Sequence, residues 1–182
     1  MLAQELAIGD YIDFAAECQM RVTDMARRYM ITLLEDLNKQ KGYKDETLYL
    51  AASLCDRYLV NLAVKNFPAP CLIKLAIICT LIAAKLEQPI QPSYNRMVKL
   101  VAKEWNIHVL KKELIGLEES VIRMLDFELH CVGPIQFLER FQRIYNLDHV
   151  AEDAEANALN NVARGFCRSM LRSRCYLSLK PS

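Results

Sequence analysis

The sequence is poor in residues that interrupt helices. Only five of its 182 residues are glycine and six are proline, and both types weaken or break a helix when they lie inside it. No segment gives a clear signal for a strand. Hydrophobic residues make up 53% of the chain and charged residues 25%, which is a composition able to fill a globular core. An all-α fold is therefore predicted.

The sequence also lacks a charge imbalance and the usual signatures of catalysis. Its 23 basic and 22 acidic side chains leave a formal net charge of +1, whereas nucleic-acid-binding domains usually carry clustered positive charge. His108, His130 and His149 are scattered. No phosphate-binding loop, nucleophile–base pair or metal-ligand cluster is evident. The protein is predicted not to be an enzyme, to hold no cofactor or metal, and to bind no nucleic acid.

Signals for secretion and for a membrane span are missing too. The N-terminus carries Glu5 and Asp10 and lacks the basic segment that opens a signal peptide. The most apolar run, Leu75 to Ala84, is shorter than the ~20 residues that span a bilayer. The seven cysteines form no C-x-x-C pair, which is typical of reduced thiols rather than of a disulfide framework or a zinc site. We expect an intracellular protein, in the nucleus, the cytoplasm or both, with no membrane partner.

Hydrophobic periodicity predicts a succession of helices. Apolar residues recur every three or four positions, and glycine and proline fall between the periodic segments, with Gly42 expected to end one helix in the left-handed conformation. The predicted helices span residues 2–18, 22–40, 46–64, 71–86, 94–103 and 109–125, followed by one beginning near 135 and one over 151–171. The helix of residues 71–86 is apolar almost all round. It is therefore predicted to be enclosed by the others at the centre of the domain.

Four short motifs follow one another along these helices. They are Asp56-Arg57-Tyr58-Leu59, Ala84-Lys85-Leu86-Glu87, Leu117-Glu118, and Asp126-Phe127-Glu128-Leu129. With five helices around an apolar third helix, this order resembles the cyclin box, the helical module by which cyclins bind and activate protein kinases. The resemblance covers about residues 20–145. It implies a regulatory subunit that binds and activates a cyclin-dependent protein kinase, with a lean towards a cell-cycle role.

The resemblance also implies a division of the chain. Residues 1–19 would form an N-terminal helix, residues 20–132 a five-helix cyclin box, and residues 133–182 a partial second cyclin box of two helices. The apolar faces of those two helices would need a cover. They could fold back on the first box, a further partner protein could cover them, or the sequence could be a shortened piece of a longer chain.

Candidate docking residues follow from the resemblance. In the family, the third and fifth helices of the box dock on the mobile helix of the kinase and favour its active arrangement. A lysine and a glutamate make the central polar contacts, and the matching residues are Lys85 and Glu118, with Leu86 and Glu87 beside the lysine. A different interpretation exists for each charge. The helix dipole favours a lysine near a C-terminus, and Glu118 beside Glu119 suits a solvated helix edge.

Asp56 is predicted to have a structural role. A carboxylate on an apolar helix face needs a cation, and the family pairs this aspartate with an arginine of the first helix. Counting back along the chain places Arg27 there. We expect a partly buried Arg27–Asp56 ion pair whose loss destabilises the fold.

Two rival functions stay open. A cyclin-fold scaffold or structural subunit without kinase activation would suit the half second box. It would also suit Leu33, which stands where mitotic and S-phase cyclins place the tryptophan of their substrate groove. Burial of Lys85 or Glu118 in a pair within the chain would favour the scaffold. A cyclin fold that grips DNA or a polymerase would use a basic edge on the last helix, although such an edge is more often solvated. The edge comprises Arg164, Arg168, Arg172, Arg174 and Lys180.

Overall fold

The computed structural model describes residues 24–65, 70–144 and 154–172. All regular secondary structure in these ranges is helical. The helices are α2 (Asp24–Lys41), α3 (Asp45–Val64), α4 (Leu72–Glu87), α5 (Tyr94–Trp105), α6 (Lys111–Met124), α7 (Pro134–Ile144) and α8 (Ala154–Arg172). The predicted all-α fold is confirmed over this part of the chain. The predicted N-terminal helix of residues 1–19 lies outside it.

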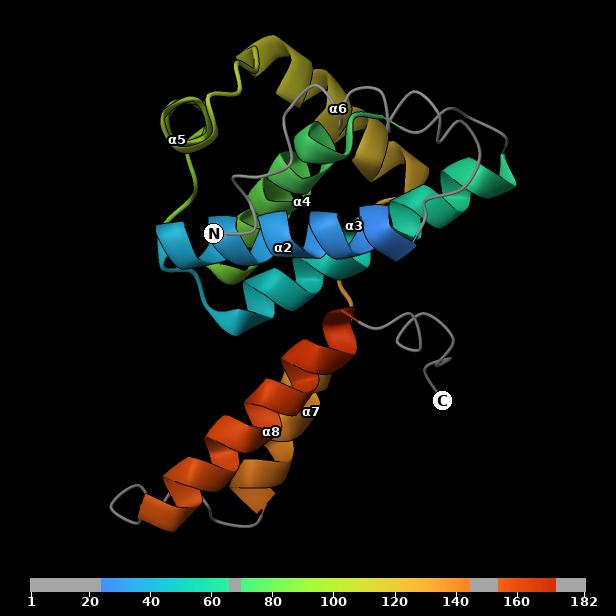
Figure 1. The fold of residues 1–182 in the computed structure, drawn as a ribbon. Coiled ribbons are helices and arrows are strands. Elements are labelled where there is room, and N and C mark those ends of the chain that lie inside the picture. Colours follow the sequence, from blue (N-terminus) through green and yellow to red (C-terminus); the bar gives the residue numbers. More distant parts are fainter. Residues whose placement is uncertain (1–23, 66–69, 145–153, 173–182) are drawn as a thin grey trace.

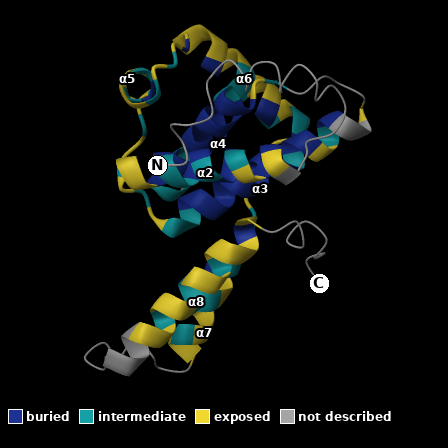
Figure 2. Cartoon of the chain, in the orientation of Figure 1, coloured by how far each residue is buried: buried dark blue, intermediate teal, exposed yellow. Residues whose placement is uncertain are grey.

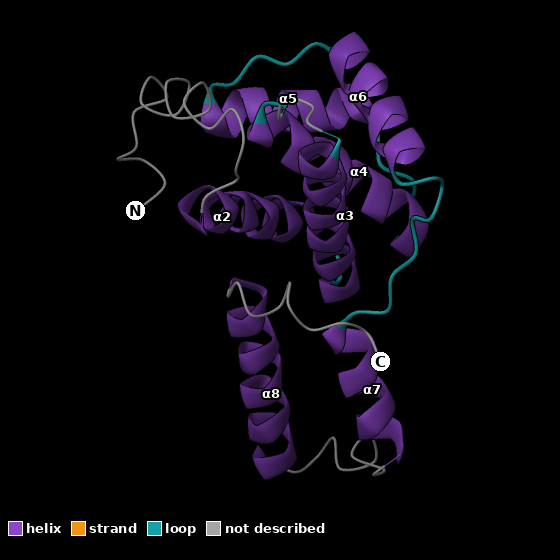
Figure 3. Ribbon diagram, turned by 90° about the vertical axis from the view of Figure 1, so that its right-hand side faces the viewer, coloured by secondary structure: helices purple, strands orange, loops and turns teal. Residues whose placement is uncertain are grey.

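Helices α2 to α6 form one bundle around α4. Figure 1 shows α4 running through the middle, with α2 and α3 on one side and α5 and α6 on the other. Helices α7 and α8 pack side by side and extend away from the bundle (Figure 3), which they meet at α3 and α2 respectively. The division of the chain into one box and a partial second box stays a prediction.

The core is built on α4, as the apolar periodicity predicted. From Leu72 to Ala84 every residue of α4 except Lys74 is buried, and Figure 2 shows this helix as an almost continuous buried segment. Met30 of α2, Leu54 of α3 and Leu75 of α4 are each 0% exposed and belong to one core cluster. Burying a side chain of this size contributes about 1.5–3 kcal/mol. The mutual packing of α2, α3 and α4 therefore supplies the framework for the rest of the molecule.

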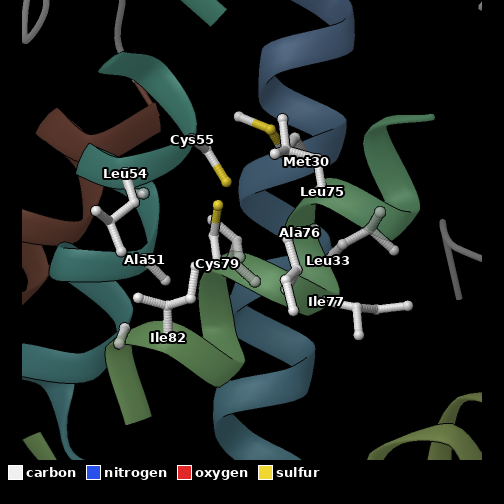
Figure 4. Close-up of a cluster of buried hydrophobic side chains, with 14 of the residues drawn as sticks. Met30, Leu33, Ala51, Leu54, Cys55, Leu75, Ala76, Ile77, Cys79 and Ile82 are labelled. Atoms are coloured by element: carbon white, nitrogen blue, oxygen red, sulfur yellow. The ribbon is translucent and has the colours of Figure 1, made fainter. Parts of the chain in front are cut away.

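Two buried cysteines face one another in this core. Figure 4 shows the sulfur atoms of Cys55 on α3 and Cys79 on α4 pointing towards each other. Both are free thiols. Burial raises the pKa of Cys55 well above 9.0, and a hydrogen bond with Cys79 adds to the effect. A thiol held neutral in this way acts as a small apolar packing group and not as a nucleophile.

Gly42 ends α2 as predicted. Its φ of +63° lies in the left-handed region that suits glycine. The N–H of Gly42 donates to the carbonyl oxygen of Lys39 at 3.2 Å, and the N–H of Tyr43 donates to that of Asn38 at 3.0 Å. These two bonds satisfy carbonyl groups that the end of a helix would otherwise leave free. The Asn38 amide also donates to the carbonyl oxygens of Tyr43 and Lys44, which fixes the short turn into α3.

Candidate functional site

Three helices bring Lys85, Tyr94 and Glu118 together. Lys85 lies in the last turn of α4, Tyr94 begins α5, and Glu118 lies in the middle of α6. The Lys85 Nζ is 2.5 Å from Glu118 Oε1 and 2.9 Å from the Tyr94 hydroxyl oxygen. The Tyr94 hydroxyl in turn donates to Glu118 Oε2. The three side chains thus form a closed ring of polar contacts, which we call the docking triad after the role predicted for Lys85 and Glu118.

The docking triad is charged and only partly exposed. The Lys85 side chain is 30% exposed and that of Glu118 is 14% exposed. Burial lowers the pKa of Lys85, but the hydrogen bonds and charge of Glu118 and Tyr94 outweigh it and raise the pKa above 10.5. Burial, and then the hydrogen bond with Glu118, raise the pKa of Tyr94. At neutral pH the lysine is therefore an ammonium and the tyrosine a neutral phenol.

Among the described residues, the ammonium of Lys85 has fewer acceptors than donors. A lysine carries three N–H donors, and within the described residues only Glu118 and Tyr94 accept from Lys85. The ammonium also lies 4.7 Å from the centroid of the Tyr94 ring, a distance at which the ring face attracts a cation. Lys85 can therefore donate to a partner without giving up either contact within the chain.

The two predicted docking residues share one site and also satisfy each other. Glu118 uses both carboxylate oxygens on contacts within the chain. Neither it nor Lys85 is fully buried. The arrangement thus lies between the two outcomes considered from the sequence. A shared and accessible site suits docking, whereas pairing within the chain suits the scaffold, so both functions remain open.

Exposed apolar side chains lie close in the sequence to the members of the docking triad. Leu86, predicted as a docking residue, is 38% exposed, and Ile90 in the following loop is 78% exposed. Ile115 is 46% exposed and lies three residues before Glu118 on α6, a spacing that places both on one helix face. Glu87, the fourth predicted docking residue, is half-buried at the end of α4. The site therefore combines a charged centre with apolar groups that a partner could cover.

Arg27 and Asp56 form a buried pair between α2 and α3. The guanidinium Nε donates to Asp56 Oδ1 at 3.0 Å and Nη2 donates to Oδ2 at 2.8 Å. The two side chains are only 6% and 7% exposed. Burial raises the pKa of Asp56, although the hydrogen bonds and charge of Arg27 act in the opposite direction. The remaining Nη1 donates to the carbonyl oxygen of Leu171 at 2.9 Å, a contact that the sequence did not indicate.

The described arginines of the basic edge on α8 all have acidic partners. Arg164 and Arg168 lie 3.1 and 2.9 Å from the Asp45 carboxylate, and Arg172 pairs with Glu35 of α2. The other two residues of the edge lie outside the described ranges. Since these arginines are already paired, the contacts argue against a track for phosphate groups.

Three further findings narrow the candidate sites within the described residues. Leu33, at the position of the missing groove tryptophan, is 5% exposed and belongs to the core. No group of three His, Cys, Asp or Glu side chains there is placed to hold a metal ion. None of the described helices is both long and apolar enough to cross a membrane.

Comparison with protein families identifies a match over most of the sequence. The family model described as "Cyclin, N-terminal domain" matches residues 2–130. This span includes the three residues of the docking triad and the Arg27–Asp56 pair.

Curated relatives agree with this match. G2/mitotic-specific cyclin S13-7 of Glycine max is 27% identical in an alignment 185 residues long, which covers 94% of this chain and 67% of the relative. Cyclin-A1-2 of Arabidopsis thaliana is 30% identical over 132 residues, covering 72% of this chain and 28% of the relative. G2/mitotic-specific cyclin-B3 of Gallus gallus is 25% identical over 179 residues, covering 98% of this chain and 40% of the relative. The chain spans less than half the length of the last two relatives.

Proposed function

The chain belongs to the cyclin family, and from that premise we propose that it is a regulatory subunit that binds a cyclin-dependent protein kinase and favours its active state. The observation that carries the proposal is the Lys85–Glu118 pair. It joins α4 to α6, the third and fifth helices expected for the cyclin box. The resemblance to cyclins assigns kinase docking to these two positions. Exposed apolar side chains lie within five residues of the pair along the sequence.

Kinase activation by this site needs no catalytic group on the chain. A kinase with a mobile helix exchanges between active and inactive arrangements, and a protein that binds the active one more tightly shifts the population towards it. The N–H of Lys85 that has no acceptor among the described residues can donate to a backbone carbonyl of the kinase. Hydrogen bonds that involve a charged group contribute about 1.5–3 kcal/mol each. Burial of Leu86, Ile90 and Ile115 against the kinase would add apolar stabilisation.

Charge exchange within the pair tests the proposal. The wild-type chain and a Lys85→Glu, Glu118→Lys variant are immobilised and exposed to a lysate of the cells that express the chain, and captured kinases are identified by mass spectrometry. The exchanged pair can still form within the chain, so the fold is retained, but the charge offered to the kinase is reversed. We expect a cyclin-dependent kinase with the wild type only.

The chain offers a matched control for this experiment. Lys74 and Glu113 also join α4 to α6, with 3.1 Å between Nζ and Oε2. Lys74 lies eleven residues before Lys85 on α4, roughly 16 Å along the helix at its usual rise, and Glu113 lies five residues before Glu118 on α6, roughly 7.5 Å along that helix. A Lys74→Glu, Glu113→Lys variant should therefore capture the kinase as the wild type does. Loss of capture in both exchanged variants would point to general disruption.

The alternative function is a cyclin-fold scaffold or structural subunit without kinase activation. It is favoured by the mutual satisfaction of Lys85 and Glu118 and by the exposed apolar residues of α7 and α8. On this alternative, a further protein covers the α7–α8 pair. Equal capture of one non-kinase partner by the wild type and by the Lys85→Glu, Glu118→Lys variant would support it.

A further inference from the structure

The Tyr94 hydroxyl is the one uncharged member of the docking triad. It accepts a hydrogen bond from Lys85 at 2.9 Å and donates one to the Glu118 carboxylate. It therefore connects the two charges by a second route, besides their direct contact at 2.5 Å. Without it, Glu118 Oε2 would lose its donor and Lys85 would lose one of its two partners.

The backbone at the start of α5 fixes where this hydroxyl lies. Ser93 is extended, with φ −100° and ψ 130°, and α5 begins at Tyr94. The N–H of Met97 donates to the carbonyl oxygen of Ser93 at 3.0 Å, and Met97 itself is 1% exposed in the core. The first turn of α5 is thus anchored, and a tyrosine has few rotatable bonds. Tyr94 can serve as a rigid reference for two flexible side chains.

Lysine and glutamate side chains lose much conformational freedom when a partner immobilises them. An ordered arrangement before binding reduces that loss and tightens the complex. The three hydrogen bonds of the docking triad hold the side chains of Lys85 and Glu118 in place before any partner binds. Within the described part of the chain, they leave one N–H of Lys85 available.

We propose that Tyr94 is a positioning residue of the docking site, whose hydroxyl holds Lys85 and Glu118 in the arrangement that the kinase recognises. This inference rests on the proposed function, because it assigns Tyr94 a part in the same site. It adds a residue from α5, a helix that the motif-based assignment of docking residues did not include. Tyr94 acts through the charged pair and need not touch the kinase.

The test is the dissociation constant of the kinase captured by the wild-type chain, measured with the purified chain and with Tyr94→Phe. This change removes only the hydroxyl. Loss of order in one or two side chains predicts about three- to tenfold weaker binding. Tyr58→Phe is the matched control, because its hydroxyl lies 3.1 Å from Ser120 Oγ on the same helix α6. It should bind within about twofold of the wild type.

A second pair of variants separates positioning from direct contact. In a Lys85→Met background the Tyr94 hydroxyl has only Glu118 left to hold, so adding Tyr94→Phe should weaken binding by a smaller factor than it does in the wild-type chain. Full additivity of the two changes would mean that Tyr94 acts independently of Lys85, and this would overturn the inference.

The remaining outcomes are also decisive. Binding by Tyr94→Phe that equals the wild type would overturn the role of Tyr94 and leave the proposed function intact. Tighter binding would mean that Tyr94 competes with the kinase for the pair, which also contradicts positioning. If the wild-type chain captures no kinase, the proposed function fails, and the positioning role fails with it.

Discussion

Arg27, in the first turns of α2, donates a hydrogen bond to the backbone carbonyl oxygen of Leu171, which lies 144 positions later in the last turn of α8. The same guanidinium holds Asp56 of α3 through two further bonds. Leu171 is 0% exposed, so its carbonyl depends on the protein for a donor. One buried side chain thus joins α2 and α3, the first two described helices, to α8, the last one.

Replacing Asp56 with alanine should destabilise the fold strongly. Arg27 would remain buried without the carboxylate that holds it through two hydrogen bonds, and breaking a buried ion pair on one side costs about 3–5 kcal/mol. Chemical unfolding of the purified variant measures this loss. Glu128→Ala is the control, because Glu128 is 83% exposed and lies 3.9 Å from Arg57, and it should cost at most about 1 kcal/mol. A melting temperature for Asp56→Ala within about one degree of wild type would contradict the structural role of the pair.

Replacing Arg27 with lysine should loosen the end of α8. Lysine keeps the charge but lacks the planar fork that reaches Asp56 twice and Leu171 once. Hydrogen exchange should become faster for the amides of the last turn of α8, while those of α4 stay protected.

Arg172→Ala is the control for this experiment. It removes an exposed contact between α8 and Glu35 of α2 but leaves the Arg27–Leu171 bond in place. The same exchange pattern in both variants would show that the end of α8 depends on surface contacts instead.

The pH dependence of Lys85 follows from its raised pKa. The ammonium is favoured in the folded state, so its contribution to stability is fully present below 10.5, the ordinary lysine pKa, and is lost as pH rises through the higher folded value. The difference in unfolding free energy between wild type and Lys85→Met should therefore be constant from about pH 6 to about pH 9. It should shrink only in stronger alkali. A difference that changes near neutral pH would show that the docking triad is not arranged as described.

The exposed apolar residues of α7 and α8 should tolerate polar substitution in the isolated chain. Phe141 is 56% exposed and Phe166 is 68% exposed, and Figure 2 shows exposed and intermediate residues alternating along α7 and α8. A double variant, Phe141→Glu with Phe166→Glu, should bind less of a hydrophobic fluorescent dye than the wild type. It should unfold at nearly the same denaturant concentration. Leu54→Ala is the contrasting variant, because it leaves a cavity in the core and should lower the free energy of unfolding by about 2–5 kcal/mol. An equal loss of stability in the double variant and in Leu54→Ala would mean that the two phenylalanines are buried in the isolated chain.

The sequence predicted the parts of the fold that depend on periodicity and on motif order. Residues 71–86 were expected at the centre because they are apolar all round, and α4 occupies that place. Helix ends differ from the prediction by a few residues, as is usual where helices fray. The left-handed conformation of Gly42 was predictable, whereas those of Asp126 and Phe127, at φ 50° and 62°, were not, because neither residue type requires it.

The residues of the site could be predicted only where a motif in the sequence marks them. Lys85 and Glu118 stand within recognisable motifs, but Tyr94 joins them because the end of α4, the start of α5 and the middle of α6 meet in space. The bond from Arg27 to Leu171 ends on a backbone carbonyl, a group that every residue carries and that no sequence pattern marks. Contacts of this kind become visible only once the helices are placed.

Kinase activity tests the central claim most directly. The kinase captured by the wild-type chain is purified, and its phosphorylation of a peptide substrate is measured alone, with the wild-type chain, and with the Lys85→Glu, Glu118→Lys variant. The account predicts a rate that rises with the wild-type chain and stays at the level of the kinase alone with the variant. Equal rates in all three reactions, with the wild-type chain demonstrably bound, would contradict it and leave the chain as a cyclin-fold scaffold.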